Sequence, residues 1–312
     1  MVNRLIAVVG PTGTGKSALA VELAKIFGGA IINADSRQFS RHLDIGTAKL
    51  SVEERDNVPH YLIDIIEPSE DYNIAEFQQA ANAIIGEVQS RKCIPILVGG
   101  SGLYVWSLLE GWQISKVPPD QTLRRVLENR ARKEGPEALY RQLDEKRALS
   151  IDPRNIRRVI RALEIQLSTH QQDPNKSKKI PPPYRILVIG LTCSRTELYR
   201  RIDQRVDKML CKGFVEEVES LLTRGFSSET PGFKSVGYKE VIKYLRGELD
   251  YEGLSERIKA ETHRLVRQQY NWFRLSDDRI HWFDITASEY KPDVNNLVLA
   301  FIRGEGVGNG FY

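Results

Sequence analysis

The chain has 312 residues, of which 41% are hydrophobic and 28% charged, with a net charge of +4. This composition is typical of a globular protein with a sizeable core, in one large domain or two smaller ones. No apolar stretch reaches the ~18 residues of a membrane span. The short N-terminal apolar run does not read as a signal peptide. Three scattered cysteines favour a reducing, cytoplasmic setting and exclude a zinc site built from paired ligands.

The charge is unevenly distributed along the chain. Residues 116–184 contain 16 Lys/Arg and 9 Asp/Glu, a balance of +7, whereas the remainder contains 29 and 32, a balance of −3. A basic segment of this kind indicates either a polyanionic partner larger than a cofactor or a solvated, charged helix face.

Residues 10–17, the phosphate loop, follow an apolar run and precede a helical pattern. They read Gly-x4-Gly-Lys-Ser, the full phosphate-binding pattern in its strand–loop–helix context. The glycines let backbone N–H groups point inward, the helix N-terminus adds positive potential, and the serine hydroxyl can reach a Mg²⁺ ion. We therefore expect a di- or triphosphate to bind the loop, through Gly10, Pro11, Thr12, Gly13, Thr14, Gly15, Lys16 and Ser17.

The elements alternate between strands and helices on both sides of an all-helical stretch, which predicts a parallel α/β sheet of the P-loop NTPase type. The predicted strands are 5–9, 30–34, 94–98, 184–190 and 281–285. The predicted helices outside the stretch are 17–25, 73–91, 102–110, 194–222, 238–245 and 254–275. Helices alone are expected from 120 to 169. We predict a core domain of 1–115 and 185–312 that is interrupted by a basic helical insertion domain at 116–184.

Two further strand ends carry polar residues, Asp35-Ser36 and Gly100-Ser101. Ligands bind at the carboxyl ends of strands in open α/β sheets, so both should line one crevice with the phosphate loop. Asp35 is a candidate general base or metal-shell carboxylate, or a cap for the following turn. Ser101 is a candidate phosphate or hydroxyl contact, or a turn residue. The strand at 94–98 lacks the terminal Asp of a mechanical ATPase, which leaves a small-molecule kinase or a non-phosphoryl transferase.

Basic residues also gather on two predicted helices. Arg154 and Arg158, and Arg157 and Arg161, are spaced i, i+4, which suits either phosphate tracking or a salt-bridged surface. In the last long helix, basic and aromatic side chains alternate along one side, as in nucleic-acid-binding helices: His263, Arg267, Tyr270 and Arg274.

These segments together resemble the tRNA dimethylallyltransferase (IPP transferase) family, in its bacterial form. The matching stretches, in family order, are GPTGTGKS (10–17), DSRQ (35–38), LDIGTAK (43–49), LVGGSGLY (97–104), DPRNIRRVIRALE (152–164), RIDQRVDKM (201–209), SVGYKE (235–240) and RQQYNWFR (267–274). They cover nearly the whole chain.

The resemblance implies a reaction and assigns roles in it. Dimethylallyl diphosphate would sit on the phosphate loop, with Mg²⁺ as cofactor. Its dimethylallyl group would pass to the N6 amine of the adenine 3′ to the tRNA anticodon. Asp35 would deprotonate that amine, Ser101 would contact the diphosphate in place of the family's usual Thr, and Arg205 would bind the diphosphate beside Lys16.

The resemblance also implies the contacts with the tRNA anticodon stem-loop. They would be made by Asp35, Ser36, Arg37, Gln38, Ser101, Arg157, Arg158, Arg161, Lys234, Gly237, Tyr238, Lys239, Arg267, Tyr270 and Arg274. Arg37 stands where an apolar residue is common in the family. We expect a cytoplasmic monomer without a membrane partner. The competing hypotheses are an enzyme that prenylates free nucleotides, a small-molecule kinase and a non-enzymatic RNA-binding module.

Overall fold

The computed structural model describes residues 3–115, 117–168 and 179–306. Two compact units divide the chain. The core unit comprises Met1–Gly111 and Pro181–Tyr312, and the helical unit comprises Trp112–Ile180. The helical unit thus begins and ends a few residues before the predicted insertion domain of 116–184.

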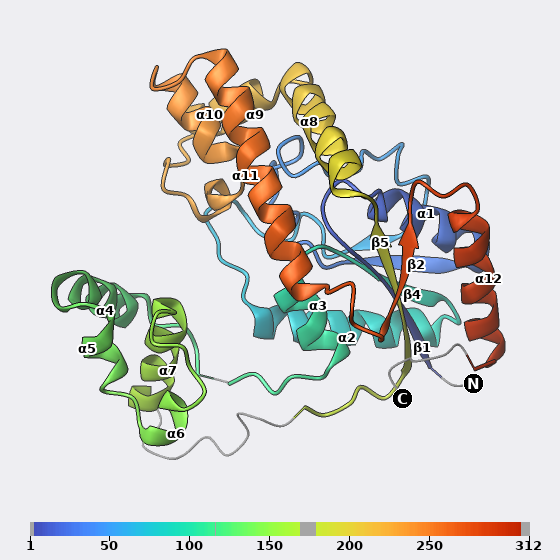
Figure 1. The fold of residues 1–312 in the computed structure, drawn as a ribbon, viewed down its shortest axis with the longest axis horizontal. Coiled ribbons are helices and arrows are strands. Elements are labelled where there is room, and N and C mark those ends of the chain that lie inside the picture. Colours follow the sequence, from blue (N-terminus) through green and yellow to red (C-terminus); the bar gives the residue numbers. More distant parts are fainter. Residues whose placement is uncertain (1–2, 116, 169–178, 307–312) are drawn as a thin grey trace. The chain divides into compact units, whose positions relative to one another are not determined.

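A six-stranded parallel sheet forms the centre of the core unit, in the order β3-β2-β4-β1-β5-β6 (Figure 1). The strands are β1 (Arg4–Val9), β2 (Gly29–Asn33), β3 (His60–Tyr61), β4 (Ile94–Val98), β5 (Arg185–Thr192) and β6 (Ile280–Asp284). The central strands are apolar and almost wholly buried, as expected of a parallel sheet covered on both faces. The predicted α/β class is confirmed, and only the two-residue β3 was not foreseen.

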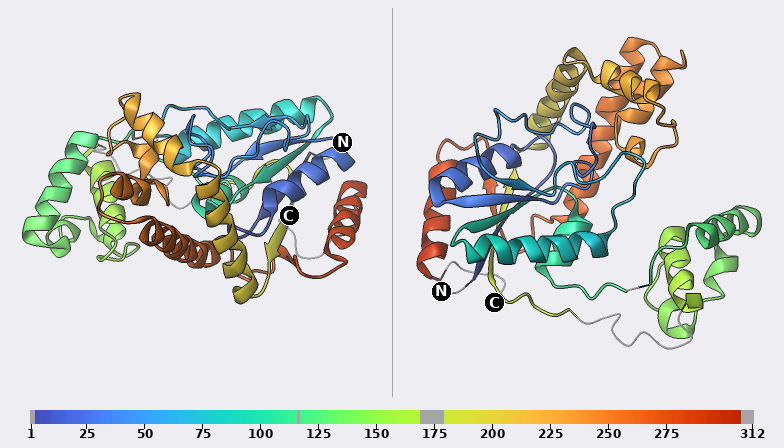
Figure 2. Two further views of the ribbon diagram at one scale, coloured as in Figure 1. Left: turned by 90° about the horizontal axis from the view of Figure 1, so that it is seen from above. Right: turned by 180° about the vertical axis from the view of Figure 1, so that it is seen from behind.

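Helices cover both faces of the sheet. The helices are α1 (Lys16–Phe27) and α12 (Tyr290–Arg303) on one face, and α2 (Ile74–Ser90) and α3 (Gly102–Leu109) on the other (Figure 2). A capping box opens α2, with the Asn73 side chain accepting from the Glu76 N–H and the Glu76 carboxylate accepting from the Asn73 N–H. The helix α12 was not among the predicted elements.

A second group of helices stands beyond the carboxyl ends of the strands (Figure 1). They are α8 (Arg195–Cys211), α9 (Phe214–Thr223), the 3₁₀ helix η1 (Pro231–Lys234), α10 (Tyr238–Leu245) and α11 (Tyr251–Trp272). The prediction of one helix over 194–222 is wrong. Gly213 adopts φ 95°, a left-handed conformation that ends α8 and begins α9.

The described residues of the helical unit form four helices with a small core of their own. They are α4 (Gln121–Glu134), α5 (Pro136–Tyr140), α6 (Glu145–Ala148) and α7 (Ile156–Ser168). Apolar side chains of α4, α5 and α7 pack together, and the fully buried Glu164 accepts hydrogen bonds from Arg124 and from the Asp120 N–H. Across the ranges that the structure describes, no helix combines the length and hydrophobicity needed to cross a bilayer.

Candidate active site

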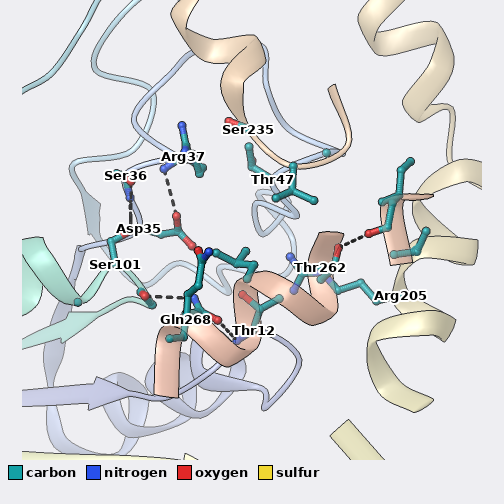
Figure 3. Close-up of a pocket in the computed structure, with 18 of the residues that line it drawn as sticks. Thr12, Asp35, Ser36, Arg37, Thr47, Ser101, Arg205, Ser235, Thr262 and Gln268 are labelled. Atoms are coloured by element: carbon teal, nitrogen blue, oxygen red, sulfur yellow. Dashed lines mark hydrogen bonds between the residues drawn. The ribbon is translucent and has the colours of Figure 1, made fainter. Parts of the chain in front are cut away.

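The three polar strand ends meet around one cavity of about 270 Å³ at the carboxyl edge of the sheet. Thr12 of the phosphate loop, Asp35 after β2 and Ser101 after β4 all line it. Asp35 and Ser101 stand on one side and Arg205 of α8 on the other (Figure 3). The crevice expected from the topology of the sheet is therefore present.

The phosphate loop is tightly folded against β5. A Cβ on Gly10, which has φ 133°, would lie 2.4 Å from the carbonyl oxygen of Leu191, so only glycine fits there. Within the loop, Thr14 Oγ1 and Lys16 Nζ each donate to the Pro11 carbonyl oxygen over 2.9 Å. The Lys16 side chain is thus folded back over the loop.

A second, smaller cavity of about 60 Å³ adjoins the phosphate loop. Of the two cavities, Lys16 and Ser17 line only the smaller one, whereas Thr12, Asp35 and Arg205 line both. Burial lowers the pKa of Lys16 to about 8, a shift that Asp35 opposes and Arg205 reinforces. Burial also lowers the pKa of Arg205, again opposed by Asp35. Asp35 therefore faces two desolvated cations across the junction of the cavities.

Asp35 and Ser101 are held by a short hydrogen-bonded network. The Arg37 N–H donates to Asp35 Oδ1 over 3.1 Å, and the Ser36 N–H donates to Ser101 Oγ over 3.0 Å. Ser36 Oγ and Ser101 Oγ lie 3.2 Å apart. Asp35 thus does cap its own turn, but with one carboxylate oxygen only. In the described part of the chain, its Oδ2 accepts no hydrogen bond and is available to a ligand.

Gln269 joins the phosphate loop to the end of β4, and the motifs did not single it out. Its side-chain oxygen accepts from the Thr12 N–H over 2.8 Å, and its amide donates to the Gly100 carbonyl over 3.1 Å. A Cβ on Gly100 would lie 2.3 Å from the Gln269 amide nitrogen. In the sequence, this close approach was indicated only by the glycine pair that follows β4.

Three aromatic side chains are part of the lining of the larger cavity. They are Tyr104, Phe214 and Trp272, and Gly102 packs so closely that its Cβ would lie 2.3 Å from Trp272. A cavity lined by aromatic rings as well as by charged groups suits a flat aromatic ligand.

The remaining residues of the core unit that were predicted to contact RNA differ in their exposure to solvent. Arg37 is exposed and lines the larger cavity, whereas Gln38 donates to the Thr47 carbonyl over 3.2 Å. Lys234 and Lys239 are exposed. The prediction that Tyr238 contacts RNA does not fit the structure, because its side chain is 0% exposed. Its neighbour Gly237 is also buried.

Tyr238 is instead a core residue. Its hydroxyl donates to Glu217 Oε1 over 2.7 Å, and burial together with the charge of Glu217 raises its pKa well above the usual value. The backbone at Gly237 closely approaches Phe214, which would lie 2.7 Å from a Cβ on Gly237.

The basic and aromatic residues near the end of α11 that were predicted to contact RNA do not line the cavity of about 270 Å³ that contains Asp35. Arg267, Tyr270 and Arg274 line a separate cavity of about 570 Å³, with Arg195 and Tyr199 of α8. Arg267 donates to the Tyr199 hydroxyl over 3.0 Å, and the Tyr270 and Thr192 hydroxyls lie 2.9 Å apart. The predicted helical position of Arg274 is wrong, because α11 ends at Trp272.

In the helical unit, the three predicted arginines differ in availability. Arg157 and Arg158 are exposed on α7. Arg161 is ion-paired with the buried Glu164 and donates to the Val117 carbonyl over 2.8 Å. Arg161 is therefore engaged within the unit, and its predicted contact with RNA stays a prediction.

The side chains near the phosphate loop could hold a magnesium ion only if a bound ligand supplied further oxygen atoms to it. Across residues 3–115, 117–168 and 179–306, no three His, Cys, Asp or Glu residues cluster to hold a metal. Ser17 does line the smaller cavity with Asp35. Since Mg²⁺ usually retains several waters and takes phosphate oxygens as ligands, a single hydroxyl is compatible with a metal carried by a bound diphosphate.

Comparison with known proteins identifies the family. The model of the IPP transferase family matches residues 38–276. A tRNA dimethylallyltransferase of Thermomicrobium roseum is 46% identical over 96% of this chain and 92% of its own.

Solved structures agree with this assignment. The full-length tRNA isopentenylpyrophosphate transferase of Bacillus halodurans is 37% identical, with a TM-score of 0.73 over 97% of both chains. A eukaryotic dimethylallyltransferase acting on tRNA is 25% identical, with a TM-score of 0.81 over 97% of this chain and 80% of its own. The chain is a member of the IPP transferase family.

Proposed function

We propose that the protein transfers a dimethylallyl group from dimethylallyl diphosphate to the N6 amine of the adenine 3′ to the anticodon of tRNA, and releases diphosphate. Family membership over nearly the full chain supports prenyl transfer to tRNA. The observation that carries the chemistry is the position of Asp35, which lines both a cationic cavity beside the phosphate loop and a larger cavity that aromatic side chains help to line.

The smaller cavity suits the diphosphate of the donor. Loop N–H groups, Lys16 and Arg205 would surround its oxygens and stabilise the negative charge that grows as the carbon–oxygen bond breaks. Ser17 would contribute its hydroxyl to a Mg²⁺ ion held by the same diphosphate. Bound there, Mg²⁺ would neutralise part of the charge on the leaving group.

The larger cavity suits the adenine. Its exocyclic amine is a poor nucleophile, because the lone pair is delocalised into the ring. As the nitrogen–carbon bond forms, the amine would pass a proton to Asp35 Oδ2, while the electron pair of the breaking bond leaves with the diphosphate. Ser101, on the same side as Asp35, would orient either reactant through its hydroxyl.

The RNA must present this adenine outside its stack, which costs a few kcal/mol and least in a single-stranded loop. Arg37 lies at the larger cavity, and Lys234 and Lys239 are exposed, so these three would meet the anticodon loop. Arg267, Tyr270 and Arg274, in their separate cavity, would reach RNA farther from the target base. We further propose that the enzyme works as a monomer in the cytoplasm, where its tRNA substrate is found.

Mass spectrometry of nucleosides from tRNA incubated with the full-length protein and dimethylallyl diphosphate tests the function. We expect a gain of one five-carbon unit on adenosine, and much slower reaction with AMP. Preferential prenylation of AMP would indicate a free-nucleotide enzyme. ATP turnover with a small acceptor would indicate a kinase, and tight RNA binding without product would indicate an RNA-binding module.

Replacement of Asp35 tests its role as the base. General-base assistance is typically worth ~10²–10⁴-fold, so we expect Asp35→Ala and Asp35→Asn to lose at least about 100-fold in kcat. Both variants should still bind dimethylallyl diphosphate. Because asparagine can keep the hydrogen bond from the Arg37 N–H, activity retained in Asp35→Asn would remove Asp35 as the base.

A further inference from the structure

Glu217 on α9 makes an unusual set of hydrogen bonds to a backbone segment far away in the chain. Its Oε2 accepts from the N–H groups of Asp44 and Ile45 over 2.9 and 2.6 Å. Its Oε1 accepts from the Gly46 N–H over 3.2 Å and from the Tyr238 hydroxyl over 2.7 Å. One carboxylate thus satisfies three consecutive backbone donors and a buried phenol.

The segment 44–46 is pressed against the aromatic core beneath Glu217. A Cβ on Gly46 would lie 2.2 Å from the Phe214 ring and 2.5 Å from the Tyr238 ring. Those two rings pack edge to face with centroids 5.0 Å apart. Because no side chain fits at Gly46, the backbone of the segment packs directly against these rings. The hydrogen bonds of Glu217 hold it in that position.

The same segment continues into the wall of both cavities. Gly46 and Thr47 line the larger cavity, and Thr47 and Ala48 line the smaller one. Gln38, three residues after Asp35, donates to the carbonyls of Thr47 and Ala48 over 3.2 and 3.4 Å. A shift of the wall would therefore be passed to the loop that carries Asp35.

Lys49 anchors the other end of this wall. Its Nζ donates to the Ser40 carbonyl over 2.6 Å, to Asp44 Oδ1 over 2.8 Å and to Asp64 Oδ1 over 2.5 Å. These partners all belong to the connection between β2 and β3 or to the residues just after β3. Glu217, in contrast, ties the wall to α9, which directly follows the helix that bears Arg205.

We propose that Glu217 is a positioning residue for prenyl transfer, which holds the wall 44–48 so that Asp35 and Arg205 keep their separation across the cavities. Glu217 lines neither cavity, so it acts through the backbone of the wall. The inference rests on the proposed transferase function.

Misplacement of reacting groups by about 1 Å can cost on the order of 100-fold in rate. We therefore expect Glu217→Ala to lower kcat with tRNA by about tenfold or more. The KM for dimethylallyl diphosphate should change less than kcat, because the loop N–H groups and Lys16, which would also bind the diphosphate, do not contact Glu217. Glu217→Gln should recover part of the loss, since its carbonyl oxygen can still accept from the N–H groups of Asp44 and Ile45.

The experiment compares steady-state kinetics and thermal unfolding of the full-length protein with its variants. Glu216→Ala is the matched control, because Glu216 lies in the same first turn of α9 and so shares any effect of charge on the helix. The control should keep the wild-type kcat.

A lowered kcat in Glu217→Ala at an unchanged unfolding temperature, with partial rescue in Glu217→Gln, supports the proposal. Loss of activity only in proportion to the unfolded fraction, or an unchanged kcat, overturns it. If Glu217→Ala does not fold, Glu217→Gln decides by the same two criteria. A wild-type protein that forms no prenylated adenosine instead refutes the proposed function, before any variant is compared.

Discussion

Lys16 combines a buried amine with a position beside the proposed leaving group. Burial lowers its pKa to about 8, from 10.5 for an ordinary lysine. The amine is mostly protonated at pH 7 and mostly neutral at pH 9, and only the charged form attracts a diphosphate. The folded protein also binds fewer protons than the unfolded chain between these two pKa values. The destabilisation caused by burying the charge is therefore full below pH 8 and declines as the pH rises toward 10.5.

We expect the dissociation constant for dimethylallyl diphosphate to rise between pH 8 and 9, by at most about tenfold per pH unit. Isothermal titration calorimetry at fixed ionic strength measures this change. A Lys16→Met variant should bind weakly throughout and lack the transition. Equal pH dependence in the variant and the wild type would assign the transition to another group.

Residues with a local signal were predictable from the sequence, and residues defined by distant partners were not. The phosphate loop and Asp35 follow short strands, so sequence spacing alone places them at one edge of the sheet. Gln269 bonds to a loop residue 257 positions away, and Glu217 to residues 171–173 positions away. No periodicity or spacing encodes such pairings, because they depend on how α9 and α11 pack over the sheet.

At the scale of elements, the junction of α3 with α11 is among the tightest in the core unit. Gly102 begins α3, and an added Cβ would meet both Cβ and Cγ of Trp272 at 2.3 Å. Because these atoms lie close to the α11 backbone, the helices must separate to admit even a methyl group. Trp272, which lines the larger cavity, would move with them.

We expect Gly102→Ala to lower the free energy of unfolding by about 1–3 kcal/mol, the usual range for overpacking. Urea denaturation measures this change. Gly86→Ala in the middle of α2 is the control, because nothing lies within 4 Å of its added Cβ. That control should stabilise the protein by about 0.5–1 kcal/mol, since alanine favours the helix. Equal effects of the two substitutions would contradict the packing argument.

Helix boundaries could be predicted only where the chain carries a strong signal. The start of the helix predicted at 73–91 is correct and coincides with the Asn73 capping box, and the Tyr238–Leu245 helix was also correct. The break at Gly213 was not predicted, because a helical glycine and a left-handed one look alike in sequence. The packing of Phe214 into the aromatic core decides between them.

At the scale of the whole molecule, the two units differ in charge and each has its own core. The basic insertion was visible in the sequence, but the roles of its arginines were not. Glu164 lies three residues after Arg161 and is fully buried, so that it takes Arg161 and Arg124 as partners. The exposed Arg157 and Arg158 are therefore the better candidates for phosphate contacts.

We expect the double variant Arg157→Ala/Arg158→Ala to bind tRNA more weakly. The slope of log Kd against log salt concentration should fall by about one for each phosphate that the variant no longer neutralises. Fluorescence anisotropy over a salt series measures both quantities. Arg154→Ala is the control for one lost charge, since it removes an exposed arginine that is already paired with Asp152. A slope unchanged in the double variant would exclude these residues as phosphate ligands.

The pairing of β1 with β5 has a consequence for biosynthesis. β1 has an early partner in β4, but its other register partners run from Arg185 to Gly190, on the far side of the inserted unit. The carbonyl of Leu191, against which Gly10 packs, is also made after that unit. A nascent chain must therefore leave one edge of a strongly apolar strand unpaired while the whole inserted unit is translated, a period in which binding by a chaperone would guard against aggregation.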